Sequence, residues 1–191
     1  MSNFLIHYGT PMHSGRYPFG SGERPYQHQS FLFVSGSSKT QDETSPYYRK
    51  ELPKTIRDEI DQAIKMKKKI IVGDAPGIDR QVQNYLKDRT YDNVEVYGSG
   101  KQVRYTANSK WKVNLIDASE YEEGSKEWLA KKDIAMTNAA TEGLAVILDE
   151  GAKATRKNVQ RLVAQNKNVK VYELSITSSE LDRWIDDVLN V

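Results

Sequence analysis

Short apolar runs alternate with longer amphipathic stretches along most of this chain. The runs are typical of buried strands and lie near residues 31–34, 69–72, 94–97, 111–116, 143–148 and 169–172. Between them, apolar residues recur three or four positions apart, which predicts helices over 51–67, 77–86, 121–139 and 155–166. Strands that alternate with helices favour parallel pairing. The pattern therefore predicts an α/β fold, a Rossmann-like three-layer sandwich with a mostly parallel central sheet.

The first 29 residues differ from this pattern, and the last residues add one helix to it. Glycine and proline recur through residues 1–29 and interrupt any period, so we interpret this segment as an extended N-terminal arm. Residues 178–189 predict an amphipathic helix with Leu181, Trp184, Ile185, Val188 and Leu189 on one face. We therefore expect a single domain over residues 30–191 that includes this C-terminal helix.

The composition narrows the class of protein. The chain has 191 residues and no cysteine, which excludes disulfides and thiolate zinc sites and fits a cytosolic protein. Its 28 basic and 26 acidic residues give a formal charge of +2, too even for a dedicated nucleic-acid binder. No apolar run is long enough to span a bilayer, so we expect no membrane partner.

Metal binding is not expected either. The three histidines, His7, His13 and His28, all fall in the arm, at spacings that match no helical pair of metal ligands. We therefore predict neither a metal site nor a cofactor.

Two glycine-bearing turns follow predicted strands and begin predicted helices. In a parallel sheet such turns lie at the carboxyl edge, where ligands bind, and helix N-termini there favour anions. The first turn offers as candidate ligand-binding residues Gly73, Asp74, Ala75, Pro76, Gly77 and Asp79. The second turn offers Gly151, Lys153, Thr155 and Arg156. Together the turns predict a nucleotide-type ligand.

Two further segments are expected at the same edge. Ser35, Gly36 and Ser37 follow the first strand and can supply hydroxyl and backbone donors to a ligand. Arg104, in the segment after the third strand, can hold a phosphate or stack on a base. Asp133 lies in the helix before the most apolar strand, and we interpret it as a surface charge.

These turns resemble those of the SLOG superfamily, which includes DNA-processing protein A and the Lonely-guy phosphoribohydrolases. The resemblance covers about residues 31–173 and rests on Val34–Ser37, on the strand that leads into Gly73–Asp79, and on Glu150–Thr155. It implies a Rossmann-like sheet that binds a nucleotide or a nucleotide-derived ligand, of the ADP-ribose, NAD or cyclic-nucleotide type. The family's tendency to dimerise implies a homo-oligomer; the alternative is that the C-terminal helix, with Trp184 and Leu189, covers the sheet of its own chain.

Two positions depart from the family's late phosphate-binding turn. Ala154 replaces its second glycine, and Asn158 replaces the glutamate of the phosphoribohydrolase branch. An amide cannot act as a general base or stabilise an oxocarbenium ion as a carboxylate does. The change favours ligand capture over cleavage. If the protein is an N-glycosidic hydrolase or glycosyl transferase, the candidate catalytic carboxylates are Glu150 and Asp79, with Asp74 as a further candidate.

The segment His7–Gly22 resembles an N-terminal motif of structural proteins from phages that infect Firmicutes. The resemblance implies a phage or prophage origin, with the protein in the host bacterial cytoplasm or docked on the virus particle through its arm. In that setting, capture would sequester a host defence signal such as a cyclic ADP-ribose-like molecule. A structural, head-associated role is the remaining alternative.

Overall fold

The computed structural model describes residues 30–41, 51–148 and 152–174, and these form one parallel α/β sheet structure. The strands are β1 (Phe31–Gly36), β2 (Lys69–Gly73), β3 (Val94–Ser99), β4 (Lys112–Ile116), β5 (Glu142–Ile147) and β6 (Asn168–Glu173). The helices are the 3-10 turn η1 (Ser38–Gln41), α1 (Lys54–Lys65), α2 (Ile78–Asp88), α3 (Lys126–Ala139) and α4 (Lys153–Ala164).

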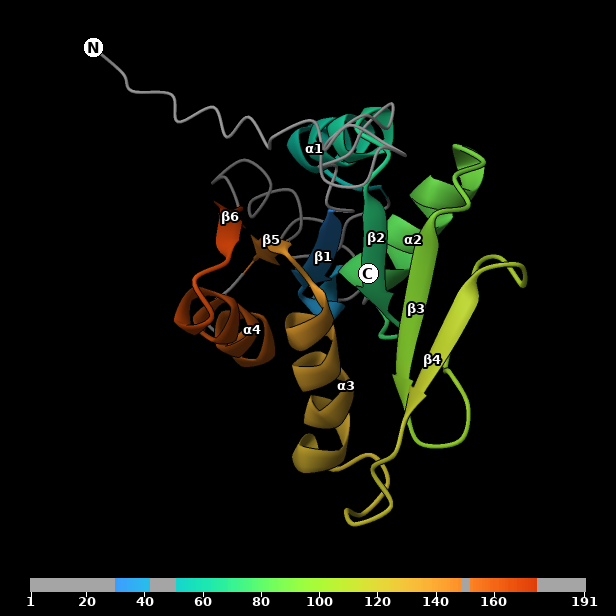
Figure 1. The fold of residues 1–191 in the computed structure, drawn as a ribbon, viewed down its shortest axis with the longest axis vertical. Helices are drawn as coiled ribbons and strands as arrows, with labels where there is room; N and C mark the ends of the chain where they lie inside the picture. The colour runs from blue at the N-terminus through green and yellow to red at the C-terminus, as the bar shows by residue number, and fades with distance from the viewer. Residues whose placement is uncertain (1–29, 42–50, 149–151, 175–191) are drawn as a thin grey trace, which may run out of the picture.

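The six strands form a single sheet in the order β4-β3-β2-β1-β5-β6 (Figure 1). Every neighbouring pair is parallel, so all the carboxyl ends lie at one edge. This arrangement confirms the predicted α/β class and three-layer architecture, and within the described residues the sheet is wholly parallel.

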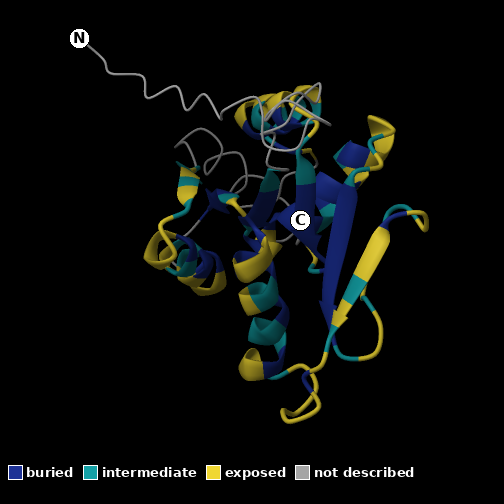
Figure 2. Cartoon of the chain, viewed as in Figure 1, coloured by how far each residue is buried: buried dark blue, intermediate teal, exposed yellow. Residues whose placement is uncertain are grey.

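Two hydrophobic cores lie on opposite faces of the sheet. Val34 and Val72 pack with the apolar residues of α1 and α2, whereas their chain neighbours Phe33 and Ile71 pack with those of α3 and α4. The alternation follows from the two-residue period of a strand. Because both faces are covered, the inner strands are mostly apolar and largely buried (Figure 2).

The edge strand β4 is more exposed, and polar contacts help to hold it to the sheet (Figure 2). The carboxylate of Glu95 on β3 accepts hydrogen bonds from Asn114 at 2.9 Å and from Lys69 at 2.8 Å. Lys112 reaches the same carboxylate at 3.3 Å. These contacts join β2, β3 and β4 near their amino ends, at the edge opposite the predicted ligand site.

The predicted strands and helices within the described residues all form, with one notable boundary shift. The helix predicted over 121–139 begins instead at Lys126. Gly124 has φ +83°, and the Ser125 hydroxyl accepts a hydrogen bond from the Trp128 N–H at 3.1 Å, so a helix cap stands where the sequence suggested helix. The N-terminal arm (1–29) and the predicted C-terminal helix (178–189) lie outside the described residues.

Candidate functional site

A cleft lies at the carboxyl edge of the sheet, where the chain direction across the sheet reverses. From β1 the chain continues through β2, β3 and β4 on one side and then crosses to β5 on the other, so the turns after β1 and β5 diverge. The cleft has a volume of about 290 Å³, close to the lower limit of typical small-molecule sites. It is lined by Phe33, Ser35, Gly36, Ser37, Ser38, Lys39, Ala75, Pro76, Asp79, Arg104, Leu129, Lys132, Asp133, Met136, Ala152, Lys153, Ala154, Thr155 and Asn158.

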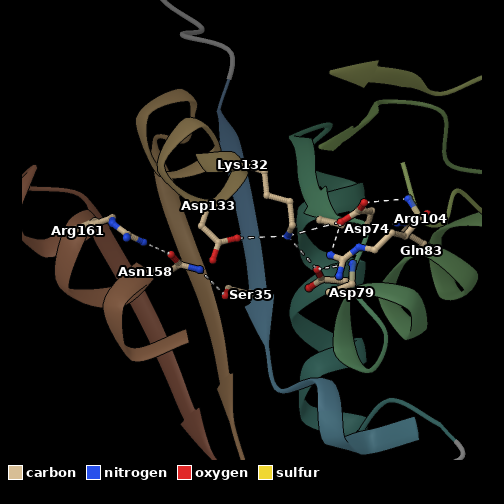
Figure 3. A network of polar contacts seen from close by, with 11 residues as sticks. Ser35, Asp74, Asp79, Gln83, Arg104, Lys132, Asp133, Asn158 and Arg161 are labelled. Atoms are coloured by element: carbon tan, nitrogen blue, oxygen red, sulfur yellow. Dashed lines mark hydrogen bonds and ion pairs between the residues drawn. The ribbon is translucent and has the colours of Figure 1, made fainter. Parts of the chain in front are cut away.

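A buried lysine on α3 carries the main charge of the cleft wall. Lys132 is 4% exposed, and its ammonium lies among three carboxylates (Figure 3). Its Nζ is 3.3 Å from Asp133 Oδ1, 3.8 Å from Asp74 Oδ1 and 4.0 Å from Asp79 Oδ2. Only the contact with Asp133 is within hydrogen-bonding distance among the described residues. An ammonium has three donors, so this one can still donate to a ligand in the cleft.

Burial acts in opposite directions on the two members of the Lys132–Asp79 pair. Burial raises the pKa of Asp79 to about 6, although Lys132 lowers it in part. Burial also opposes the charge on Lys132, but Asp79, Asp133 and Asp74 outweigh it and raise the pKa of this ammonium. Lys132 is therefore protonated at neutral pH. Asp79, with a pKa of about 6, changes its protonation state just below neutral pH.

Asp74 is held by the loop that follows β3. Its carboxylate accepts a hydrogen bond from the Arg104 backbone N–H at 2.9 Å and pairs with the Arg104 guanidinium at 2.6 Å. Burial raises the pKa of Asp74, but the two bonds from Arg104 together with Lys132 leave it below its usual value. Asp74 is therefore ionised, and its carboxylate is already bound by Arg104. Arg104 retains further N–H donors at the rim of the cleft.

The two helix N-termini at the cleft differ in character. At α2, Asp79 lies in the first turn, and its carboxylate accepts the Ala75 N–H at 3.3 Å, so the positive end of this helix already has an anion. At α4 the first turn contains no acidic residue, and Ala152 at the N-cap has no side chain that can accept a hydrogen bond. The first N–H groups of α4 have no partner within the helix. An anionic ligand group therefore fits at α4 and not at α2.

Asn158 lies inside the cleft wall and fixes a serine there. Its side-chain amide donates to Ser35 Oγ at 3.1 Å, and its carbonyl oxygen accepts from Arg161 at 2.7 Å (Figure 3). The position at which the resembling enzymes carry a glutamate is thus a buried amide with both ends engaged.

Most of the sequence-predicted ligand residues come together here. Those that line the cleft are Ser35, Gly36, Ser37, Ala75, Pro76, Asp79, Arg104, Lys153 and Thr155. Gly73, Asp74 and Gly77 do not line it. A Cβ on Gly73 would lie 2.8 Å from Lys132 Nζ, so this glycine allows the lysine to approach the turn.

The remaining predicted residues lie elsewhere. Arg156 does not line the cleft; it pairs with Glu173 at 3.1 Å, with side chains 43% and 66% exposed. Glu150 and Gly151 lie outside the described residues, as do the three histidines of the arm.

The contribution of α3 was not predicted from the sequence. Leu129, Lys132, Asp133 and Met136 line the cleft from one face of this helix, and Asp133, interpreted as a surface charge, has a side chain only 16% exposed. Their spacing of i, i+3, i+4 and i+7 is the signal that places them on one face. Lys132 lies between Leu129 and Met136 on that face, and a lysine at such a core position indicates a functional site.

Comparisons of the chain with protein-family models and with curated proteins find no match. The resemblance to the SLOG superfamily therefore stays a prediction. Within residues 30–41, 51–148 and 152–174, no group of three or more His, Cys, Asp or Glu side chains is placed to hold a metal ion. None of the described helices has the length and apolar character needed to cross a membrane.

Proposed function

We propose that the protein binds a small anionic ligand of the nucleotide type in this cleft, and that it captures the ligand without cleaving it. The observation that carries the proposal is Lys132, a buried ammonium with hydrogen-bonding capacity to spare in the wall of a cleft at the topological switch point. An ammonium has three donors, and a phosphate or hydroxyl oxygen of a ligand can accept from those that Asp133 leaves unused.

The two ends of the cleft favour a ligand with two kinds of polar group. The α4 end supplies backbone N–H groups, the Thr155 hydroxyl and the Lys153 ammonium, which suits one phosphate. Elsewhere in the lining, α2 and α3 supply the carboxylates of Asp79 and Asp133, which accept hydrogen bonds from hydroxyl or amino groups. A ribose or base attached to a phosphate carries both groups, as in ADP-ribose, NAD and cyclic nucleotides.

Capture is favoured over cleavage by the state of Asn158. Its amide is buried and uses both ends in hydrogen bonds to protein groups, so it cannot take a proton from water or substrate. In the phage setting implied by the N-terminal motif, capture would sequester a host nucleotide signal. The head-associated alternative depends on the arm, which lies outside the described residues.

One observation keeps N-glycosidic hydrolysis or transfer as a second candidate function. Asp79 lines the cleft, and burial raises its pKa to about 6, which is near the value that suits a general acid or base. If the protein is such an enzyme, Asp79→Asn abolishes turnover of a nucleoside monophosphate while ligand binding persists.

Native mass spectrometry tests the proposal without assuming the identity of the ligand. Purified wild-type protein is incubated with a small-molecule extract of bacterial cells and compared with Lys132→Met and with the adjacent control Lys131→Met. We expect one small ligand on the wild type and on Lys131→Met, and none on Lys132→Met. A wild type that carries no ligand, or a ligand retained equally by Lys132→Met, contradicts the proposal.

A further inference from the structure

The connection between β3 and β4 has an unusual construction for a parallel crossover. Residues 100–111 join the two strands without a helix, although parallel crossovers usually contain one. Helical hydrogen bonds therefore do not set the path of this loop. Its path has to be set by contacts with other elements, and the loop carries Arg104 at the rim of the cleft.

One face of α2 supplies these contacts. Arg80, Gln83 and Asn84 are spaced i, i+3 and i+4 and all reach the loop. The Arg80 guanidinium lies 4.6 Å from the ring centroid of Tyr105, and the Tyr105 hydroxyl donates to Asn84 Oδ1 at 2.5 Å. These two contacts are between side chains.

Gln83 differs because it binds main-chain atoms at both ends. Its side-chain amide donates to the Gly73 carbonyl oxygen at 2.8 Å, and its carbonyl oxygen accepts the Ala107 N–H at 3.0 Å. The side chain is 0% exposed. A buried amide is tolerated when its donors and acceptors are paired, and here the pairing joins the end of β2 to the loop.

The same two segments also meet at the cleft. Asp74, the residue after Gly73, binds both the backbone N–H and the guanidinium of Arg104, three residues before Ala107. The Gln83 bridge and the Asp74–Arg104 contacts therefore hold one loop against one turn at two neighbouring points. Loss of the Gln83 bridge frees the loop on the Ala107 side and weakens the restraint on Arg104.

We propose that Gln83 is a positioning residue for ligand binding: by joining the Gly73 carbonyl to the Ala107 N–H, it fixes Arg104 at the rim of the cleft. Gln83 does not line the cleft and acts only through Arg104. The binding part of this inference rests on the proposed function, whereas the positioning part stands on the loop alone.

Two measurements separate these parts. Amide hydrogen exchange of the free protein reports the loop, and titration with ADP-ribose as the probe reports binding. The variants are Gln83→Leu, Arg104→Ala and their combination, with Tyr105→Phe as the control that removes the neighbouring hydroxyl contact. Gln83→Glu is the conservative variant, because a protonated glutamate reproduces both hydrogen bonds and an ionised one cannot donate to Gly73.

We expect Gln83→Leu to speed exchange at the Arg104 amide, which Gln83 does not touch, by about tenfold, with a smaller effect in Tyr105→Phe. It weakens ADP-ribose binding by no more than Arg104→Ala does, and the double variant is no weaker than Arg104→Ala alone. Relative to wild type at the same pH, Gln83→Glu binds normally at acidic pH. At alkaline pH it binds more weakly, because the ionised carboxylate repels the Gly73 carbonyl oxygen although it still accepts the Ala107 N–H.

Unchanged exchange at Arg104 in both Gln83 variants, or additive losses in the double variant, overturns the inference. If Gln83→Leu does not fold, Gln83→Glu decides by its pH dependence. If exchange responds as expected but the wild type does not bind ADP-ribose or the other nucleotides of its class, the positioning of Arg104 stands and the proposed function fails.

Discussion

At the scale of single residues, Lys132 balances a concentration of negative charge inside the protein. Replacing it with methionine leaves Asp74, Asp79 and Asp133 near one another without their shared cation. Removing one partner from a buried ion pair typically costs about 3–5 kcal/mol. We expect urea unfolding to give a loss of this size for Lys132→Met.

The neighbouring Lys131 is the matched control for that measurement. Its partner Glu120 is largely exposed, and exposed pairs contribute little. Lys131→Met is therefore expected to change the free energy of unfolding by less than about 0.5 kcal/mol. Equal losses for the two variants would show that the three carboxylates do not depend on Lys132.

We expect Asp79 to make the free energy of unfolding depend on pH. Because burial raises its pKa from 3.8 to about 6, the folded protein binds more protons than the unfolded chain between these values. Stability contributed by this group is therefore present at acidic pH and lost as the pH rises from about 4 to 6. The difference between the two pKa values corresponds to about 3 kcal/mol of unfolding free energy.

Asp79→Asn should remove this slope and stabilise the free protein at neutral pH, as measured by denaturant unfolding between pH 4 and 8. Asp88→Asn, at the exposed far end of the same helix, serves as the control. An unchanged slope in Asp79→Asn would mean that Asp79 ionises in the folded protein as easily as it does in water.

The residues that the sequence predicted share one property, which is that they lie at the carboxyl end of a strand or in the turn and helix start after it. Ser35, Asp79 and Thr155 could be placed at the carboxyl edge from strand order alone. Lys132 and Asp133 could not, because they lie in the middle of a helix and reach the cleft through the packing of α3 on the sheet. Their environment depends on tertiary contacts that no local pattern contains.

At the scale of elements, the turn before α2 depends on a glycine with φ +82°. A Cβ on Gly77 would collide with the Ser37 carbonyl oxygen and lie 2.5 Å from Ser38 Cα. Gly77→Ala therefore forces the turn away from the segment after β1 in addition to the backbone penalty. We expect a loss of at least about 2 kcal/mol in unfolding free energy.

Gly124 is the control that separates the backbone penalty of Gly77→Ala from its steric clash. It has nearly the same φ, +83°, but a Cβ there meets no atom within 4 Å. Gly124→Ala should therefore cost only about 1 kcal/mol, the penalty of the left-handed conformation. If both glycines tolerate alanine equally, the close contact between the turns after β1 and β2 is not needed for the fold.

The elements themselves were predicted well because each one carries a clear period. β1, β2 and β5 contain short apolar runs, and the edge strands β4 and β6 alternate apolar with polar residues. Helices such as α1 and α2 carry one apolar face each. The start of α3 was less predictable. Ser125 can be recognised as the helix cap only when Gly124 is known to have a positive φ. The loop 100–111 contains no helix or strand and therefore has no periodic pattern in the sequence. Its path depends instead on contacts with side chains of α2.

At the scale of the whole molecule, the strand order determines where the cleft lies. Parallel pairing and alternation with helices were predictable, but the order β4-β3-β2-β1-β5-β6 was not, because strand neighbours are set by packing across the sheet. That order brings the turn after β1, the start of α2 and the start of α4 together at one crevice. We therefore propose a single ligand site, at this crevice.

The most direct test is calorimetric titration of the wild type, Lys153→Glu and Lys157→Glu with ADP-ribose, NAD, a nucleoside monophosphate and a cyclic nucleotide. Both lysines are exposed on α4, but only Lys153 lines the cleft, so the two charge reversals are matched. We predict that at least one ligand binds the wild type and Lys157→Glu with a 1:1 stoichiometry, and that Lys153→Glu weakens it by about tenfold or more. Absence of binding by every ligand, or equal weakening by the two variants, would contradict the claim.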